Sequence, residues 1–281
     1  MILFGTAGLS ESFSTLGYKK TVEVPEYLTK MGLDAFEYQC GRGVKIKEAS
    51  AVEFGAACKA KGIVLSLHAP YFISMSSVEE DKRLNSVRYI LESAQALKAM
   101  GGKRVIFHSG SCAKLPRQEA LAKAVDTMGL IMKALDENGF GDMTVCPETM
   151  GKVNQLGTLQ EVMALCKVDD RIIPCIDFGH LNARDGGSIK TITDYANIID
   201  TIENEIGADR AKVFHSHFSK IEYTTGGEKR HLTFADTQYG PEFEPLMEII
   251  ARKNLTPTII CESDGTQAED ARTMKTYFNT L

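Results

Sequence analysis

The sequence predicts a single (β/α)8 barrel, an α/β fold in which eight parallel strands alternate with eight helices. Short runs rich in β-branched residues alternate with longer helical patterns from one end of the 281 residues to the other. That length suits one barrel domain, which we expect to span residues 1–281, and no internal repeat, low-complexity tract or linker divides it. Candidate ligand residues follow several different strands, whereas a doubly wound sheet, the competing architecture, would gather them at one switch point.

The expected strands are short apolar runs bounded by turn residues, and the expected helices fill the intervals between them. The strands are 2–5, 34–39, 63–67, 103–107, 143–146, 172–176, 212–217 and 257–261. The helices are 22–31, 48–61, 79–100, 117–138, 158–167, 189–205, 242–253 and 267–279.

Local signals mark the ends of three of these helices. Thr158 precedes an apolar run and Glu161 follows three residues later, which is the pattern of a capping box at a helix start. Gly62 and the pair Gly101-Gly102 stand where two helical patterns stop, as is typical of glycines that end helices.

Composition places the chain among ordinary globular proteins. Hydrophobic residues make up 43% and charged residues 25%, so a sizeable core can form. The formal net charge of -5 and the pI of about 5.8 argue against a broadly basic nucleic-acid-binding surface, although a local basic rim or bound metal can still attract phosphate. No signal-peptide pattern and no apolar run long enough to span a membrane is present, so we expect a cytoplasmic protein.

The seven cysteines form no CxxC pair and no compact framework. Cys146, Cys175 and Cys261 lie within apolar strand runs, where a free cysteine behaves as a small hydrophobe. We therefore expect reduced core cysteines rather than metal ligands.

Five of the six histidines and three carboxylates lie where a predicted strand ends; only His231 has no predicted strand before it. A parallel barrel brings its strand ends together at one mouth, so residues far apart in sequence can share one pocket. One histidine on an apolar strand is usually a hydrogen-bonded core residue, but several strands ending in this way indicate ligands for a cluster of divalent metals. The set comprises His68, His108, Glu148, Asp177, His180, His215, His217 and Glu262.

The types of these residues bear on the metal. Asp177 and His180 are three apart on a turn, which can aim both side chains at one ion or at two neighbouring ions. Glu148 and Glu262 each carry two oxygens and can bridge two ions. Donors of His, Asp and Glu without Cys suit Zn²⁺ or Mn²⁺, and the large share of imidazole favours zinc.

These motifs resemble the endonuclease IV family of apurinic/apyrimidinic endonucleases, part of the wider xylose-isomerase-like TIM barrel group. The resemblance covers nearly the whole chain, in the same order and at similar spacing. The matching stretches are His68-x-x-Tyr71-Phe72, Phe107-His108-x-Gly110, Glu148-Thr149-x-Gly151, Cys175-Ile176-Asp177-x-x-His180, His215-x-x-x-Ser219-Lys220, His231 and Glu262. The resemblance implies a zinc-dependent hydrolase that cleaves DNA 5′ to abasic sites in base-excision repair, and we expect it to act as a monomer.

The resemblance also implies which residues hold three zinc ions. They are His68, His108 and Glu148 for the first ion, Glu148, Asp177, His215 and Glu262 for the second, and His180 and His231 for the third. Two or three such ions would polarise the scissile phosphate and activate a water, while Glu148 and Glu262, the expected catalytic residues, orient the ions and the water.

One departure from the family pattern concerns the third ion. The family places an aspartate two residues before the last histidine, and here that position is Lys229. Glu228, Asp236 or His217 are the candidates to replace it; otherwise the enzyme holds two metals.

Four residues are candidates for contact with DNA. Tyr71 and Phe72 match family residues that wedge into the helix at the lesion, although two aromatics can equally pack on a neighbouring loop. Arg42, on a glycine-flanked turn, and Lys220, after the seventh strand, are candidates for phosphate contacts.

Two other functional classes remain open at this stage. A sugar isomerase or epimerase of the same barrel group would hold one ion through Glu148, Asp177, His215 and Glu262, and leave the remaining histidines as substrate contacts. A metal-binding module without catalysis is the third class.

Overall fold

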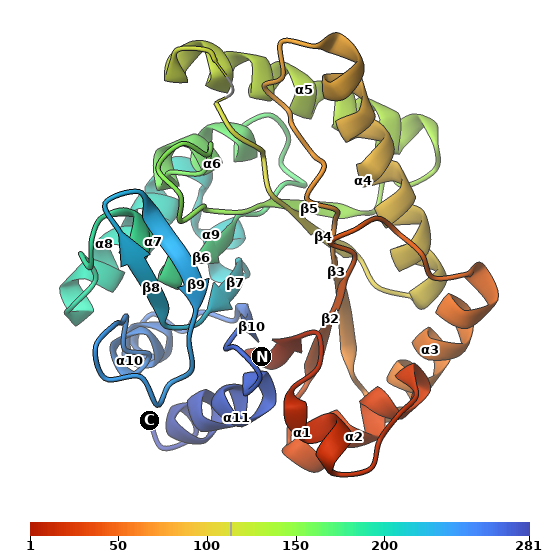
Figure 1. Ribbon diagram of the computed structural model, residues 1–281, viewed down its shortest axis with the longest axis vertical. Coiled ribbons are helices and arrows are strands. Elements are labelled where there is room, and N and C mark those ends of the chain that lie inside the picture. Colours follow the sequence, from red (N-terminus) through yellow and green to blue (C-terminus); the bar gives the residue numbers. More distant parts are fainter. Residues whose placement is uncertain (113) are drawn as a thin grey trace.

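Eight parallel strands form the predicted barrel in the computed structural model, which describes residues 1–112 and 114–281 (Figure 1). Hydrogen-bonded neighbours follow the order β5-β4-β3-β2-β1-β10-β7-β6. The ring closes between β5 and β6, because Thr149 N donates to Cys175 O at 3.0 Å and Ile173 N donates to Val145 O at 3.3 Å. The strands are β1 (Leu3–Ala7), β2 (Ala35–Gln39), β3 (Val64–His68), β4 (Arg104–Phe107), β5 (Thr144–Pro147), β6 (Cys175–Asp177), β7 (His215–Phe218) and β10 (Thr258–Cys261). The predicted fold class is confirmed.

The eight predicted helices all form around the strands, each within three residues of its expected ends (Figure 1). Thr158 and Glu161 make the predicted capping box, and Gly62 and Gly101 end their helices in the left-handed conformation. The helices are α2 (Val24–Met31), α3 (Glu48–Lys61), α4 (Glu80–Met100), α5 (Arg117–Glu137), α6 (Leu159–Cys166), α8 (Ile192–Ile206), α10 (Glu244–Arg252) and α11 (Gln267–Phe278). None of the described helices is long and apolar enough to cross a membrane.

Several short elements were not predicted, since they lack the length that periodicity needs. They are α1 (Glu11–Thr15), the 3-10 turn η1 (Thr21–Glu23), α7 (Phe178–Arg184), α9 (Ala208–Lys212) and the antiparallel hairpin of β8 (Ile221–Thr224) and β9 (Gly227–His231). The hairpin strands are polar and carry no alternating apolar pattern. Because β9 ends at His231, the expectation that no strand precedes this histidine is wrong.

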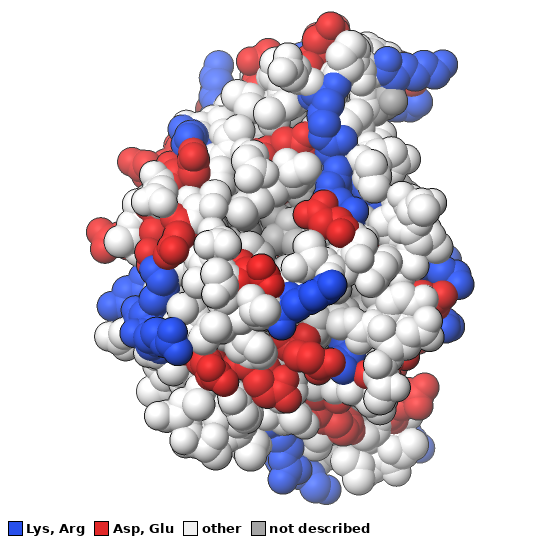
Figure 2. All heavy atoms as spheres, turned by 90° about the vertical axis from the view of Figure 1, so that its left-hand side faces the viewer, with Lys and Arg blue, Asp and Glu red and all other residues white. Residues whose placement is uncertain are grey.

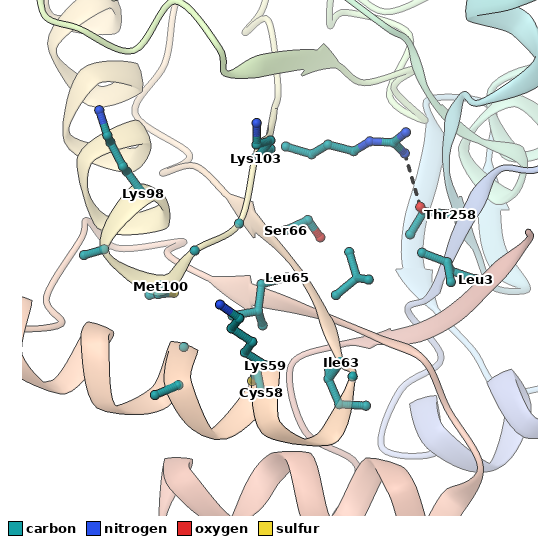
Figure 3. Close-up of a pocket in the computed structure, with 18 of the residues that line it drawn as sticks. Leu3, Cys58, Lys59, Ile63, Leu65, Ser66, Lys98, Met100, Lys103 and Thr258 are labelled. Carbon is teal, nitrogen blue, oxygen red and sulfur yellow. Dashed lines mark hydrogen bonds between the residues drawn. The ribbon is translucent and has the colours of Figure 1, made fainter.

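The floor of the barrel, where the strands begin, is closed by Arg104. Its guanidinium donates to Thr258 Oγ1 at 3.2 Å and to Val213 O at 2.9 Å. A cavity of about 740 Å³ lies outside this floor, between α3 and α4 (Figure 3). Lys98 and Lys103 on its rim are bound to a backbone carbonyl and to a carboxylate. The polar groups of the floor are thus largely paired, and the chemically unusual end of the barrel is the opposite one.

Candidate metal centre

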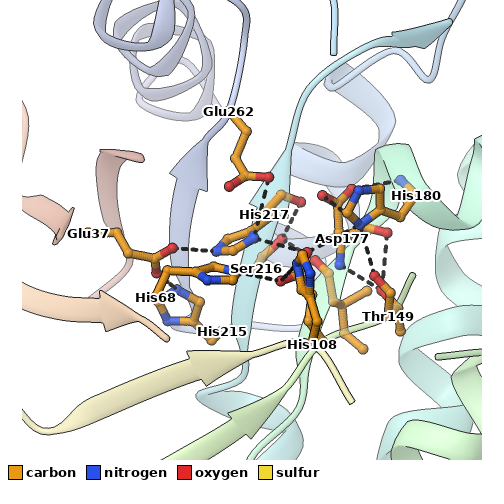
Figure 4. Close-up of polar contacts among 12 residues, drawn as sticks. Glu37, His68, His108, Thr149, Asp177, His180, His215, Ser216, His217 and Glu262 are labelled. Carbon is orange, nitrogen blue, oxygen red and sulfur yellow. Dashed lines mark hydrogen bonds and ion pairs between the residues drawn. The ribbon is translucent and has the colours of Figure 1, made fainter. Parts of the chain in front are cut away.

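The carboxyl ends of six barrel strands bring imidazoles and carboxylates into one buried cluster (Figure 4). β3 and β7 carry their histidines within the strand, β6 ends on its aspartate, and the residues after β4, β5 and β10 supply the rest. Among the described residues the donor atoms form four groups, in each of which all atoms lie within 4.8 Å of one another. The first is His68, His108 and Glu148; the second is Glu148, Asp177, His217 and Glu262; and the third is His180, Glu228 and His231. The fourth, Cys175, His215 and His217, is fully buried and shares His217 with the second.

The first group joins two imidazoles to one carboxylate oxygen. Glu148 Oε2 lies 3.1 Å from His68 Nε2 and 3.2 Å from His108 Nε2. His68 Nδ1 faces the carbonyl of Ala69 at 2.9 Å, so Nδ1 carries a proton and Nε2 offers its lone pair to the cluster. Burial lowers the pKa of His108, and the neighbouring Glu148 only partly opposes that shift. Neutral imidazole is the form that binds metal.

The second group contains three carboxylates, two of them fully buried. His217 Nδ1 lies 3.3 Å from Glu148 Oε1 and 3.5 Å from Glu262 Oε2. Burial raises the pKa of Asp177 to about 6. The charge of His180 opposes this rise, and the negative charges of Glu262 and Glu148 add to it. By contrast, the pKa of Glu148 lies well below its usual range, because His217 and His108 outweigh its burial.

Two oxygens of this group make no hydrogen bond among the described residues: Glu148 Oε1 and Asp177 Oδ2, both buried. A buried carboxylate oxygen without a partner costs free energy unless a cation neutralises it. The orphaned oxygens and the converging imidazoles therefore fit a divalent ion, and the donor types fit zinc or manganese.

A β-bulge builds the third group. Glu222 pairs with Arg230, and Tyr223 pairs with Glu228, so Lys229 is the extra residue of β9. In a regular strand Lys229, two residues before His231, would point inward as His231 does. The bulge moves Lys229 out of this position and turns Glu228 inward instead.

Lys229 turns outward, where its Nζ binds Glu222 Oε1 at 2.5 Å. On the inner side, Glu228 Oε2 lies 3.4 Å from His180 Nε2. Of the three predicted replacements for the family aspartate, Glu228 is therefore the one at the third group. His217 belongs to the second group, and the carboxylate of Asp236 accepts the backbone N–H groups of Gln238 and Tyr239.

Gly151 allows the hairpin to approach this group. A Cβ at Gly151 would lie 2.5 Å from the Cβ of Glu228 and 2.9 Å from Cδ2 of His180. Only a glycine fits between the loop after β5 and the hairpin.

The structure places His215 one layer below the second group, where sequence reasoning expected it to be a ligand. Period-2 alternation puts His215 and His217 on the barrel interior, but alternation does not say how deep each lies. Across the sheet, His217 pairs with Asp177 whereas His215 pairs with Cys175, one layer lower. His217, not His215, therefore belongs with Asp177 and Glu262. His215 binds Glu37 instead, and burial lowers the pKa of His215 to about 4.

The sequence prediction overlooked Glu37, a fully buried carboxylate in the middle of β2. Its signal was a charged residue between Phe36 and Tyr38, at an inward position of a strand. It lies beneath the second group, with Oε1 2.9 Å from His217 Nε2 and Oε2 3.0 Å from His215 Nε2 (Figure 4).

A cleft of about 430 Å³ opens over the cluster and is lined by members of the first three groups. Tyr71 stands at its edge, 62% exposed, with its ring stacked 5.6 Å from the ring of His108. Phe72 beside it is 53% exposed, and Arg42 is exposed on a neighbouring turn. Exposed aromatics beside a polar cleft leave faces on which a flat ring can stack.

Lys220 is not available at this surface, which corrects its predicted role in DNA contact. Its side chain is buried, and Nζ donates to Asp236 O at 2.8 Å and to Glu242 Oε1 at 2.7 Å. Arg117 and Arg184 likewise bind backbone carbonyls of the loop after β5. On the side that carries α8 and the hairpin, the described acidic and basic side chains are interspersed without one continuous basic surface (Figure 2). Among the described residues, Lys220, Arg117 and Arg184 are therefore engaged within the protein, whereas Arg42 and Lys152 are exposed near the cleft.

Sequence comparison identifies the class of protein: residues 25–277 match the family described as xylose isomerase-like TIM barrel, and the chain belongs to that family. It is 33% identical over 279 residues to the uncharacterized protein MJ0133 of Methanocaldococcus jannaschii, an alignment that covers 99% of this chain and 97% of that protein.

More distant relatives carry the name probable endonuclease 4, in agreement with the predicted resemblance. The Mycoplasma pneumoniae protein is 27% identical over 195 residues, covering 67% of this chain and 64% of its own length. The Methanosphaera stadtmanae protein is 30% identical over 199 residues, covering 68% and 67%. The chain thus spans about two thirds of these relatives.

Solved structures share the fold. Endonuclease IV from Thermus thermophilus superposes with a TM-score of 0.70 at 20% identity, covering 99% of this chain and all of that one. A D-psicose 3-epimerase superposes with a TM-score of 0.71 at 14% identity, covering 100% and 99%. Because an endonuclease and an epimerase fit equally well, overall similarity does not decide the activity, and the cluster itself must.

Proposed function

We propose that the protein is a metal-dependent phosphodiesterase that cleaves DNA 5′ to abasic sites. The observation that carries the proposal is the number of ligand groups around one cleft: three of the four groups contribute to its lining, and two of those three share Glu148. A single-ion enzyme needs only one such group and would use the other histidines as substrate contacts, although they are grouped as ligands would be. Two or more ions at one phosphate are the usual arrangement for hydrolysis of a phosphodiester.

The residues of this chain have distinct roles in the proposal. Bound zinc ions would supply Lewis-acid polarisation of the phosphate and a more acidic water. Glu148 would hold ions in both of its groups, because each of its two oxygens faces a different pair of imidazoles. Glu262, whose side chain is 15% exposed, faces the cleft and is placed to orient the attacking water and accept its proton.

Tyr71 and Phe72 provide the feature that favours an abasic site. Where a base is missing, an aromatic side chain can replace the lost stacking at the cost of a few kcal/mol of local unstacking. Both rings are exposed, and that of Tyr71 lies against the ligand His108. Arg42 and Lys152 are the cations of this region that we assign to the DNA backbone.

The direct test is cleavage of a synthetic duplex that carries one abasic analogue, with zinc or manganese supplied. We expect a single cut on the 5′ side that leaves a 3′-hydroxyl, with no cut after chelation. Glu148→Gln should abolish it. The matched control is Gly129→Ala in α5, because a Cβ there meets no atom within 4 Å. Absence of cleavage with full metal occupancy would contradict the proposal.

A second candidate, a sugar isomerase or epimerase, is favoured by the composition of the second group alone. Glu148, Asp177, His217 and Glu262 offer one ion three carboxylates and an imidazole. This activity would appear as interconversion of ketoses by protein loaded with one equivalent of Mn²⁺, and it would survive Glu228→Gln.

A further inference from the structure

We infer that Glu37 is a positioning residue that holds His217 with its Nδ1 lone pair directed at the metal centre. The inference rests on the proposed metal centre, and deepens it by one layer of residues. A histidine that ligates metal commonly donates its other ring N–H to a carboxylate or carbonyl, which fixes the tautomer and the ring orientation.

Three hydrogen-bonding side chains and the ring of His217 surround the carboxylate of Glu37. Gln39 Nε2 donates to Oε1 at 3.2 Å, and Ser66 Oγ donates to Oε2 at 3.0 Å. His215 Nε2 lies 3.0 Å from Oε2, and His217 Nε2 lies 2.9 Å from Oε1. A carboxylate has about four lone-pair positions, so this one has none left for a metal ion. Glu37 is therefore a partner of a ligand and not itself a ligand.

The tautomer of His217 follows from these distances. Neither ring nitrogen of His217 makes a hydrogen bond of regular geometry among the described residues, but Nε2 lies 2.9 Å from Glu37 Oε1. Because an ionised carboxylate only accepts hydrogen bonds, this proximity favours the tautomer of His217 with its proton on Nε2. Nδ1 of His217 is then unprotonated, and it faces Glu148 Oε1 at 3.3 Å and Glu262 Oε2 at 3.5 Å.

The attachment of Glu37 is rigid. Ser66 is its direct neighbour on β3, in parallel register, whereas His217 and His215 come from β7 across the barrel. Glu37, His215 and His217 are all fully buried, and Ser66 is buried too. The carboxylate thus ties both sides of the barrel together directly under the second group, at a depth that substrate does not reach.

The test compares Glu37→Gln with Ser66→Ala, which removes a different donor to the same carboxylate. In Glu37→Gln we expect one equivalent of Co²⁺ or Zn²⁺ to bind about 10- to 100-fold more weakly, with the others unchanged, as is usual when a partner of a ligand is lost. The visible spectrum of the Co²⁺ protein should change for that equivalent alone. Ser66→Ala should leave all affinities within about threefold of the original. Unchanged affinities in Glu37→Gln, or equal weakening of every equivalent, would overturn the inference.

A measurement on the unsubstituted protein avoids dependence on the folding of a variant. Long-range ¹H–¹⁵N NMR of the histidine rings reports which nitrogen carries the proton. We expect His217 to carry it on Nε2, with and without metal, and a proton on Nδ1 would refute the assigned role. If the unsubstituted protein bound no divalent ion, the proposed metal centre would fail, whereas the tautomer of His217 would still be decided by this measurement.

Discussion

Replacement of Gly151 by alanine should damage the third ligand group and spare the other two. The new Cβ would lie 2.5 Å from the Cβ of Glu228 and 2.9 Å from Cδ2 of His180. Carbon atoms pack at about 3.5–4.0 Å, so the hairpin must withdraw by about 1 Å from the loop after β5. Ligand distances tolerate only about 0.2 Å, so a displacement of this size would prevent Glu228 and His180 from holding one ion together.

The expected cost in stability is modest, about 1–3 kcal/mol for an overpacked site, so the barrel should still fold. Dialysis against a mild chelator, followed by elemental analysis, should show one equivalent of metal lost before the others. Gly129→Ala is the control: it places a methyl group in open space on α5 and should raise helix stability by about 0.5–1 kcal/mol with no loss of metal. If Gly151→Ala retained every equivalent as firmly as the unsubstituted protein, the assignment of Glu228 to the third group would be wrong.

Three further predictions concern the same structure. Glu228→Gln should release the same equivalent of bound metal as Gly151→Ala. Lys229→Ala should release none, because Lys229 points outward to Glu222. Loss of metal on dialysis of Lys229→Ala but not of Glu228→Gln would show that Glu228 is not the ligand. Tyr71→Ala combined with Phe72→Ala should weaken binding to abasic duplex more than it slows cleavage of a gapped substrate that is already flexible, and equal effects on both would assign these rings to loop packing. A thiol reagent at pH 8 should modify the half-buried Cys112 well before Cys40, Cys58, Cys146 and Cys261. Burial raises the pKa of each of those four thiols to about 12, so they stay protonated and unreactive. Rapid labelling of the four in the folded protein, detected by mass spectrometry, would contradict their placement.

Sequence patterns predicted the barrel well because each of its strands is a distinct apolar run between turn residues. The same patterns placed most of the candidate ligands at strand ends, which parallel topology brings together. What the patterns could not supply is register between strands. His215 and His217 have the same alternation, and only their pairing with Cys175 and Asp177 shows which one reaches the upper layer.

Two other differences have similar causes. The bulge in β9 shifts the inward position from Lys229 to Glu228, and no residue in this polar hairpin predicts a bulge. Lys220 follows a strand end as a phosphate-binding lysine would, but its direction depends on Glu242, which is distant in sequence. Glu37 was not predicted as a site residue because its partners, on β3 and β7, are distant from it in sequence.

The central claim is that the mouth of the barrel holds a cluster of metal ions and not a single one. Elemental analysis of protein purified without chelator measures this directly. Two to three equivalents per chain, mostly zinc, are expected from three ligand groups around the cleft, two of which share Glu148. A value near one, unchanged when zinc or manganese is added in excess, would contradict the claim and favour the single-ion sugar enzyme.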